Sequence, residues 1–403
     1  MNTYNLKSVR EGRASIFVVD IKSLGLHHPC RSPVFYNPNM ELSRNIDVAV
    51  LRAILDNLNF NLRNLVDLTA GTGIRGIRYA LESIPHELKD YLKLFFVDKN
   101  KLACSILRRN IERNGLSKIS MVLNEDARLA ILKIRYELNI HPCIIDIDPF
   151  GTPVPFMDCA FLALRNEGIL MITATDMAPL QGIHPKACIR KYFSKPLKVR
   201  FSREIAVRIL LGYIAREGAK YGVSIEPLYT YSQKHFIRII VRVKHGIKLC
   251  NNLLDKSIGY LYYCSKCGNK FMDNALYPNV ERICNVCGSK LKVAGPLWTD
   301  LLWNVQLAKN VPKSYRKLKY FFTKFVKEGE NIVATIADEA LINSPFHATD
   351  ELASIHKVRE FSPKKAVEML RDFGFQASLT HFSPKGFRTN AGINNIIRII
   401  RSL

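Results

Sequence analysis

The sequence predicts an α/β fold, with a doubly wound and mostly parallel sheet in residues 1–248. Short apolar runs alternate with segments of helical periodicity, which is the pattern of such sheets. A glycine-rich turn follows the first of these runs, and acidic residues follow several others. Because doubly wound folds bind ligands at the carboxyl ends of their strands, we expect the binding site there.

Five apolar runs are predicted to form the parallel strands. The helical spacing of apolar residues over 41–58 predicts a helix before the first of them. Residues 1–20 suggest a short strand or hairpin, and residues 223–244 suggest two strands that finish the sheet, one of them antiparallel. The five runs are residues 62–68, 94–97, 119–123, 143–145 and 170–175.

The turn Thr69-Ala70-Gly71-Thr72-Gly73 lets the backbone pass close to a ligand. Nicotinamide-dinucleotide sites share this weak glycine signal, so an NAD-dependent oxidoreductase is one alternative. Asp67 stands just before the glycines, which suits a ligand with a positive amino group and disfavours a pyrophosphate. Asp98 ends the next strand, about 25 residues beyond the turn, where an acid typically binds ribose hydroxyls.

The stretch 146–151, Asp-Ile-Asp-Pro-Phe-Gly, follows a buried apolar run and combines carboxylates with an aromatic ring. Such a set suits an aromatic amine, because oxygen acceptors bind the amino group and the ring stacks on the base. Asp146 and Asp148 lie two residues apart, and the direction of each side chain decides which of them reaches a substrate. From the pattern alone, both remain candidates for the acid.

Composition limits the partners of the chain. Of its 403 residues 48% are hydrophobic, so it can form full cores, and its formal charge of +24 favours a polyphosphate partner such as nucleic acid. No apolar run is long enough to cross a membrane, and the first residues show no secretory leader. We therefore expect a cytoplasmic protein without a membrane partner.

A second domain, at residues 249–403, is predicted to be a smaller α+β unit. Two C-x-x-C-G segments have the spacing of a four-cysteine zinc ribbon at about residues 260–292, in which the metal is structural. Later residues predict helices at 349–358 and 363–372 and a basic strand–turn–strand, which together suggest a winged-helix variant. The predicted ligands are Cys264, Cys267, Cys284 and Cys287.

Two basic segments are candidate RNA contacts. Residues 184–220 contain ten Lys or Arg and two Glu, and we expect the basic side chains to lie on the solvent-facing side of a helix. Residues 301–327 interleave basic and aromatic residues, which suits RNA but equally suits an amphipathic helix with a solvated face.

Six sequence blocks together resemble the Trm1 family, the tRNA (guanine-N2)-dimethyltransferases that act at tRNA position 26. The resemblance implies a Rossmann-like S-adenosylmethionine-dependent methyltransferase domain and two successive methyl transfers to one guanine of a tRNA partner. The blocks are R-S-P-V-F-Y-N-P-N-M, D-L-T-A-G-T-G-I-R-G-I-R-Y, D-I-D-P-F-G-T-P, T-A-T-D-M-A-P-L, G-P-L-W and T-H-F-S-P-K-G-F-R-T-N.

The resemblance also assigns residues. It implies that Asp148 is the catalytic acid, that Phe150 stacks on the flipped guanine and that Phe35 closes its other face. Asp126 would accept from the adenine amino group, and Asp67 would lie near the methionine ammonium. The positions that match the family's S-adenosylmethionine contacts are Arg44, Arg75, Asp98, Asp126 and Ala127.

Two further functions remain open from the sequence. One is a methyltransferase for exocyclic amines of DNA or of another RNA, since the acid and ring would serve an adenine amine equally well. The other is a catalytically dead methyltransferase fold used as a tRNA-binding module, which the intact acids argue against. We expect the chain to act as a monomer.

Overall fold

The computed structural model describes residues 4–275, 277–278 and 282–401, which form two compact units. Unit 1 comprises Met1–Pro149, Asp158–Ile172 and Lys309–Ala334, and unit 2 comprises Phe150–Met157, Thr173–Ala308 and Thr335–Leu403. These units interleave along the chain and therefore differ from the division into 1–248 and 249–403, which stays a prediction. Residues 276 and 279–281 of the predicted zinc ribbon lie outside the described residues.

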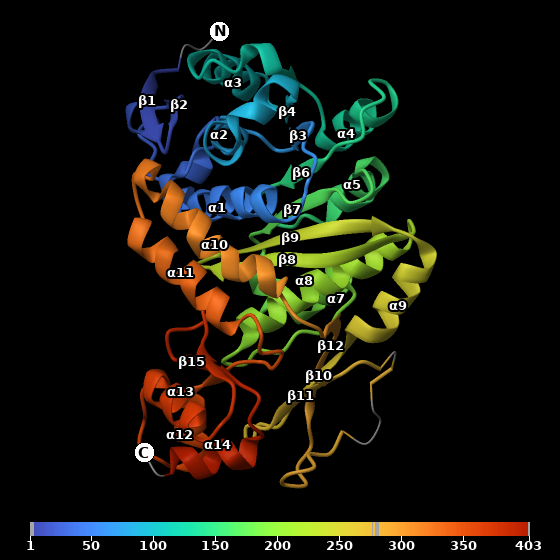
Figure 1. The fold of residues 1–403 in the computed structure, drawn as a ribbon, viewed down its shortest axis with the longest axis vertical. Helices are drawn as coiled ribbons and strands as arrows, with labels where there is room; N and C mark the ends of the chain where they lie inside the picture. Colours follow the sequence, from blue (N-terminus) through green and yellow to red (C-terminus); the bar gives the residue numbers. More distant parts are fainter. Residues whose placement is uncertain (1–3, 276, 279–281, 402–403) are drawn as a thin grey trace. The chain divides into compact units, whose positions relative to one another are not determined.

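Unit 1 contains the parallel part of the sheet, where neighbouring strands pair in the order β5-β4-β3-β6-β7. Figure 1 labels β3, β4, β6 and β7. The strands are short and apolar because both faces of the sheet are covered. All five predicted strands are present. They are β3 (Asn64–Asp67), β4 (Lys93–Val97), β5 (Ser120–Leu123), β6 (Ile144–Ile147) and β7 (Ile169–Ala174), whose last two residues belong to unit 2.

The helices of unit 1 bury the apolar residues that recur at helical spacing, and capping side chains mark where some of them begin. In α3, the Asn100 side chain accepts hydrogen bonds from the backbone N–H groups of Leu102 and Ala103, and apolar residues of this helix are buried. The N-terminal hairpin and the helix at 41–58 are confirmed. The elements are β1 (Leu6–Glu11), β2 (Ala14–Val19), α1 (Glu41–Asn57), α2 (Ile74–Arg78), α3 (Lys101–Arg113), α4 (Ala127–Tyr136), α5 (Met157–Ala163), whose first residue belongs to unit 2, and α11 (Val326–Glu339), whose residues from Thr335 onward belong to unit 2.

Unit 2 contributes the antiparallel pair β8 and β9, so that the whole sheet has the order β5-β4-β3-β6-β7-β9-β8. This mixed sheet of seven strands confirms the predicted Rossmann-like fold. Helix α8 packs against β8. The elements are α6 (Met177–Leu180), α7 (Pro185–Tyr192), α8 (Ser202–Ala219), β8 (Val223–Gln233), β9 (Phe236–His245), α9 (Ile247–Ser257), β10 (Ile258–Tyr263), β11 (Lys270–Asp273), β12 (Lys292–Trp298) and the start of α10 (Val305–Leu318), whose residues from Lys309 onward belong to unit 1.

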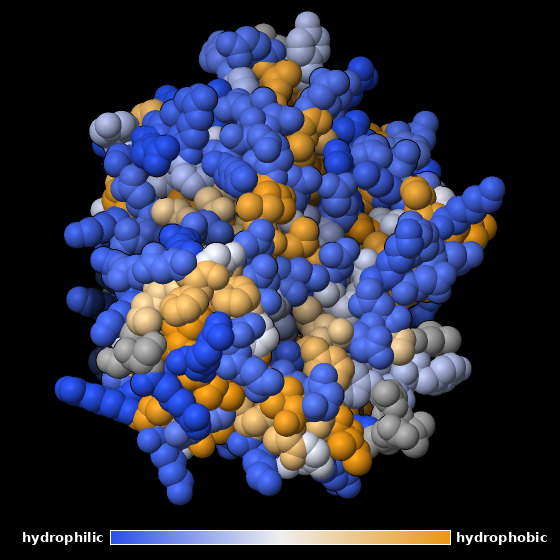
Figure 2. Space-filling model, turned by 60° about the horizontal axis from the view of Figure 1, so that its bottom comes forward, coloured by the Kyte–Doolittle hydropathy of each residue, from blue (hydrophilic) through white to orange (hydrophobic). Residues whose placement is uncertain are grey.

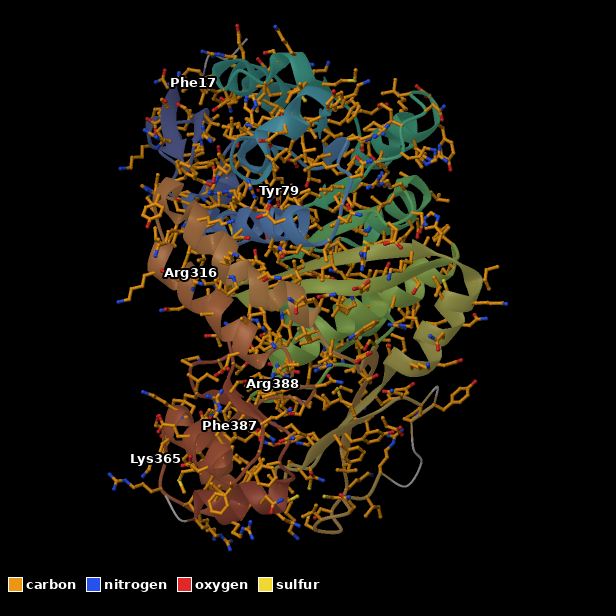
Figure 3. All side chains as sticks on the ribbon, in the orientation of Figure 1. Phe17, Tyr79, Arg316, Lys365, Phe387 and Arg388 are labelled. Carbon is orange, nitrogen blue, oxygen red and sulfur yellow. The ribbon has the colours of Figure 1, made fainter. Side chains whose placement is uncertain are left out.

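The end of unit 2 contains the two predicted helices and the predicted strand–turn–strand, followed by a third helix, α14, that the sequence pattern did not predict. The sheet order is β13-β15-β14. Arg388 of β15, which is labelled in Figure 3, is fully buried between the carboxylates of Glu204 and Glu339. The elements are β13 (His347–Ala348), α12 (Thr349–His356), α13 (Pro363–Asp372), β14 (Ala377–Leu379), β15 (Gly386–Thr389) and α14 (Ile393–Ile400).

The surface carries many charged side chains. The face drawn in Figure 2 is mostly hydrophilic, and smaller apolar patches interrupt it. Among the described residues, no helix is both long and apolar enough to span a bilayer.

Candidate active site

The glycine turn between β3 and α2 is shaped by backbone that only glycine accommodates. Gly73 has φ +78°, and a Cβ there would lie 2.2 Å from Leu107 Cδ1. A Cβ on Gly76 would lie 2.4 Å from the Phe96 ring, so α2 packs closely on β4. These two glycines therefore let the turn and α2 pack closely against Leu107 of α3 and Phe96 of β4.

Four of the predicted acids lie at the carboxyl ends of neighbouring parallel strands. Asp67 ends β3, Asp98 follows β4, Asp126 precedes α4 after β5, and Asp148 follows β6. The parallel registers of these strands place all four positions at one edge of the sheet. The structure thus gathers the acids that the sequence predicted.

Asp98 and Asp126 organise the loops that hold them. The Asp98 carboxylate accepts hydrogen bonds from the backbone N–H of Gly71, at 2.9 Å, and of Asn100, at 2.8 Å. Asp126 is the N-cap of α4 and accepts from the backbone and the side chain of Arg128, and these hydrogen bonds lower its pKa. Ala127, which follows it, is half-buried. Both carboxylates fit hydrogen-bond acceptors for hydroxyl or amino groups.

Asp67 is buried and differs electrostatically from these two acids. Burial and the neighbouring Asp146 carboxylate raise its pKa to about 7, against the opposing charge of Arg75. Its Oδ2 accepts the backbone N–H of Gly76 at 3.2 Å. A ligand ammonium at this position would favour the ionised carboxylate.

Arg75 links the glycine-turn helix to the candidate acid. Its guanidinium donates to Asp148 Oδ2 at 2.6 Å and to Asp47, a fully buried carboxylate of α1. Ser43 Oγ lies 3.4 Å from the same guanidinium. Charge-assisted hydrogen bonds of this kind fix the Asp148 carboxylate in one orientation.

Asp146 and Asp148 have different surroundings. Asp146 is fully buried and accepts a 2.7 Å hydrogen bond from the hydroxyl of Tyr79, which is labelled in Figure 3. The Asp148 side chain is 26% exposed, and its backbone N–H donates to Thr69 Oγ1. Of the two carboxylates, Asp148 is the one that a substrate can reach.

Arg44 lies in a buried ion-pair network that the sequence did not indicate. Its guanidinium donates to both carboxylate oxygens of Glu11, at 2.5 and 2.7 Å, and to the Asn37 carbonyl. Glu11 also accepts from Arg78 and from the Tyr36 hydroxyl, and the guanidinium groups hold its pKa near 2 despite burial. Arg44 thereby fixes the loop that carries Phe35. Neither Glu11 nor Asp47 has a motif that would have identified it.

The two predicted stacking rings belong to different units. Phe35 lies in unit 1, where its carbonyl approaches Gly71, and it is half-buried. Phe150 lies in unit 2 and is 69% exposed, which is unusual for so large an apolar side chain in a structured loop.

The four predicted zinc ligands come together in unit 2. Their sulfur atoms all lie within 4.8 Å of one another, with Cys264 and Cys287 at 3.5 Å and Cys267 and Cys284 at 3.6 Å. A tetrahedron with Zn–S bonds of about 2.3 Å has sulfur–sulfur edges of about 3.8 Å, so the cluster fits a structural zinc ion.

The basic segments fold only partly as expected. For α8 the prediction of a solvent-facing basic side is wrong at Arg208, which is fully buried because Glu204 and two backbone carbonyls satisfy it. Of the exposed cations of the 184–220 segment, all but one lie instead before α8. They are Lys186, Arg190, Lys195, Lys198 and Arg200, and the remaining one, Lys220, follows the end of α8.

The 301–327 segment contains an amphipathic helix with a basic face. In α10, Lys313, Arg316 and Lys317 are exposed, whereas Tyr315 is buried and donates to the Val326 carbonyl. Some of the aromatic residues of this segment therefore serve the core. Tyr320 is 83% exposed and remains available to a base.

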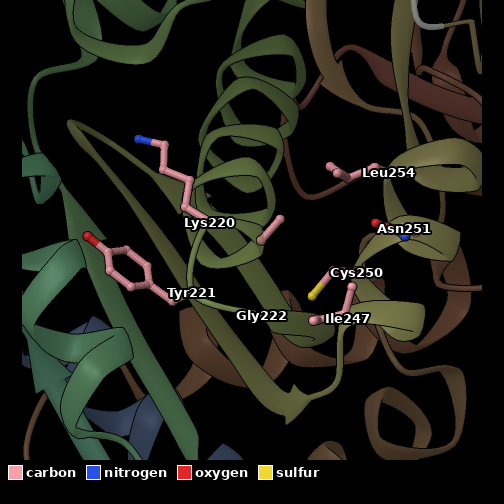
Figure 4. Close-up of a pocket in the computed structure, with 8 residues that line it drawn as sticks. Lys220, Tyr221, Gly222, Ile247, Cys250, Asn251 and Leu254 are labelled. Atoms are coloured by element: carbon pink, nitrogen blue, oxygen red, sulfur yellow. The ribbon is translucent and has the colours of Figure 1, made fainter.

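One surface groove of unit 2 lies between the end of α8 and α9 (Figure 4). It has no acidic lining residue, so it lacks the acceptors that the cluster at the sheet edge provides. Its lining residues are Ala219, Lys220, Tyr221, Gly222, Ile247, Cys250, Asn251 and Leu254.

Comparisons with known proteins agree over the whole length. Residues 12–401 match the family model described as N2,N2-dimethylguanosine tRNA methyltransferase. A tRNA (guanine(26)-N(2))-dimethyltransferase of Saccharolobus islandicus is 35% identical, covering 99% of each chain. One of Methanobrevibacter smithii is 34% identical, covering 100% of this chain and 99% of its own. The structure of Trm1 from Pyrococcus horikoshii with S-adenosyl-L-methionine superposes with a TM-score of 0.82 at 31% identity, covering 98% of this chain and 100% of its own.

Proposed function

Because the chain belongs to the N2,N2-dimethylguanosine tRNA methyltransferase family, we propose that it dimethylates the exocyclic N2 of guanine 26 in tRNA. S-adenosylmethionine, when bound, supplies the methyl group on a sulfonium. The observation that carries the proposal is the accessible Asp148 carboxylate, oriented by Arg75 at the sheet edge where the other acids gather. The full-length similarity supports the substrate.

We assign the cofactor contacts by chemistry. Asp98 would accept the ribose hydroxyls, and Asp126 would accept the adenine amino group while the Ala127 N–H donates to a ring nitrogen. Asp67 would pair with the ammonium of the methionine part. The remaining proposed contacts, Arg44 and Arg75, are guanidinium groups suited to a carboxylate.

The chemical role of Asp148 is to accept hydrogen from the N2 amine. A guanine amine is a weak nucleophile, since its lone pair is delocalised into the ring. A carboxylate can accept a hydrogen bond from one N–H group of the amine. If it takes that proton as the new C–N bond forms, positive charge does not build up on the nitrogen. The monomethylated guanine still carries one N–H, so the same carboxylate serves the second transfer once it has released the first proton to solvent.

Phe35 and Phe150 are proposed to stack on the two faces of the target guanine. Base–aromatic stacking stabilises a flipped base by about 1–3 kcal/mol. The extruded base would lose its own stacking and pairing, and the rings offset part of that cost.

The basic segments are proposed to bind tRNA phosphates. The exposed cations of α10 and of the segment before α8 supply a sequence-independent contact. We propose that residues 249–403 act as the tRNA-binding domain, with zinc in the four-cysteine cluster stabilising its fold. That the protein is cytoplasmic and monomeric stays a prediction.

Mass spectrometry of nucleosides tests the proposal. An unmodified tRNA transcript is incubated with the protein and S-adenosylmethionine, and N2,N2-dimethylguanosine is expected. A transcript with adenine at position 26 is the control and should gain none. Absence of product together with absence of S-adenosylmethionine binding in calorimetry would indicate a catalytically dead tRNA-binding module, and methylated adenine would indicate a different amine substrate.

A further inference from the structure

The loop after Asp148 presents its aromatic ring outward although its backbone is firmly held. Phe150 is 69% exposed, whereas Pro149 and Pro153 are buried. Gly151 has φ +85°. Its N–H donates to Thr175 Oγ1 at 2.7 Å, and its carbonyl accepts the Thr175 N–H at 2.8 Å. The ring is thus carried by a loop in which both the backbone N–H and the backbone carbonyl of Gly151 form hydrogen bonds with Thr175.

A chain of side-chain hydrogen bonds continues from this loop. The Tyr192 hydroxyl donates to Asp176 Oδ1 at 2.7 Å and lies 2.8 Å from Thr152 Oγ1. A tyrosine hydroxyl has one hydrogen, so the Thr152 hydroxyl is the donor to Tyr192. Thr152 Oγ1 in turn accepts the Val154 N–H at 3.4 Å, a long contact.

The far end of this chain is anchored by charge. Lys191 Nζ lies 3.0 Å from Asp176 Oδ2, and the Asp176 side chain is 10% exposed. Burial and the Asp176 charge raise the pKa of Tyr192 far above its usual range, so its hydroxyl keeps its hydrogen. The direction of every hydrogen bond from Thr152 to Asp176 is therefore fixed.

We propose that Thr152, Tyr192 and Asp176 form a clasp that positions the Phe150 loop for the target base. The clasp residues are positioning residues, because they act through the loop and not on the reacting atoms. This proposal rests on the proposed function, in which Phe150 stacks on guanine. A loop that is already ordered loses less conformational entropy when the base binds, which favours affinity. Asp176 belongs to the T-A-T-D-M-A-P-L block, which the proposed chemistry otherwise leaves without a role.

The test compares Thr152→Val, which removes the hydroxyl at similar volume, with Thr152→Ser, which keeps it. For Thr152→Val we expect kcat/KM for tRNA to fall about tenfold, as for loss of one hydrogen bond, mainly through KM. Thr152→Ser should stay within about twofold of wild type. The Kd of S-adenosylmethionine and the Tm should be unchanged in both variants.

A second measurement addresses the loop directly. Hydrogen exchange of the peptide covering residues 149–157 should be faster in Thr152→Val than in Thr152→Ser. This difference does not depend on which methylated nucleoside the protein forms. Equal exchange and equal kinetics in the two variants would overturn the clasp. A parallel fall in Tm and cofactor affinity in Thr152→Val would overturn it as well, because the hydroxyl would then be merely structural.

The two proposals fail in different ways. If wild-type protein forms no N2,N2-dimethylguanosine, the proposed function fails even when the exchange difference is present. If wild-type protein forms the product and the two Thr152 variants behave alike, only the clasp fails.

Discussion

Binding of S-adenosylmethionine is expected to release a proton from Asp67. The pKa of this buried carboxyl is raised to about 7 by burial, by Asp146 and, less strongly, by Asp148, with Arg75 opposing. At about pH 6 a group with this pKa is protonated in about nine molecules of ten. A ligand ammonium beside it favours the ionised form, so its hydrogen leaves on binding.

The magnitude follows from these values. At about pH 6 we expect release of about 0.9 proton per cofactor bound, because the ligand's α-amino group, with a pKa near 8, is already charged. The sign follows from linkage: binding that releases a proton is favoured as pH rises. Affinity should therefore increase about fivefold from pH 6 to pH 7 and level off above.

Isothermal titration calorimetry in buffers of different ionisation enthalpy measures the proton count. Asp67→Asn should reduce the release to near zero. Asp126→Asn is the matched control, since it should weaken binding through the adenine contact but keep the release. Wild-type binding without proton release at about pH 6, or release that persists in Asp67→Asn, would refute the assignment of Asp67 to the ammonium.

Three further predictions concern the acid, the metal and the charge. Asp148→Asn should lower kcat, measured in stopped assays, by at least about a hundredfold and leave the cofactor Kd, measured by calorimetry, nearly unchanged. A comparable loss of kcat in Asp146→Asn without loss of stability would favour Asp146 as the acid instead. Cys264→Ser with Cys267→Ser should remove zinc, by metal analysis, and lower the Tm, whereas Cys188→Ser should leave the metal in place; a metal-free wild type would contradict the ribbon. Neutralising Lys313, Arg316 and Lys317 together should reduce the slope of log affinity for tRNA against log salt by about 2 to 3, and an unchanged slope would show that α10 is only a solvated face.

The fold class and most of the candidate site could be predicted from residue patterns along the chain. The glycine turn, the acids after the strands and the C-x-x-C-G spacing are local signals, because turns, strand ends and metal knuckles are set by neighbouring residues. Thus Asp67, Asp98 and Asp126 were expected at strand ends and lie there, and the four cysteines were expected to meet and do so.

Tertiary structure alone decided how the site is supported. Arg44 pairs with Glu11 and Arg75 pairs with Asp47. The two members of each pair are about 30 positions apart in the sequence, and no spacing rule relates such partners. The choice between Asp146 and Asp148 likewise depends on burial and on Tyr79, which only packing determines. Arg208 shows the same limit: a basic residue on a helix is expected in solvent, and its burial becomes favourable only because the backbone carbonyls of Trp298 and Asp300, far along the chain, join Glu204 of the same helix as its partners.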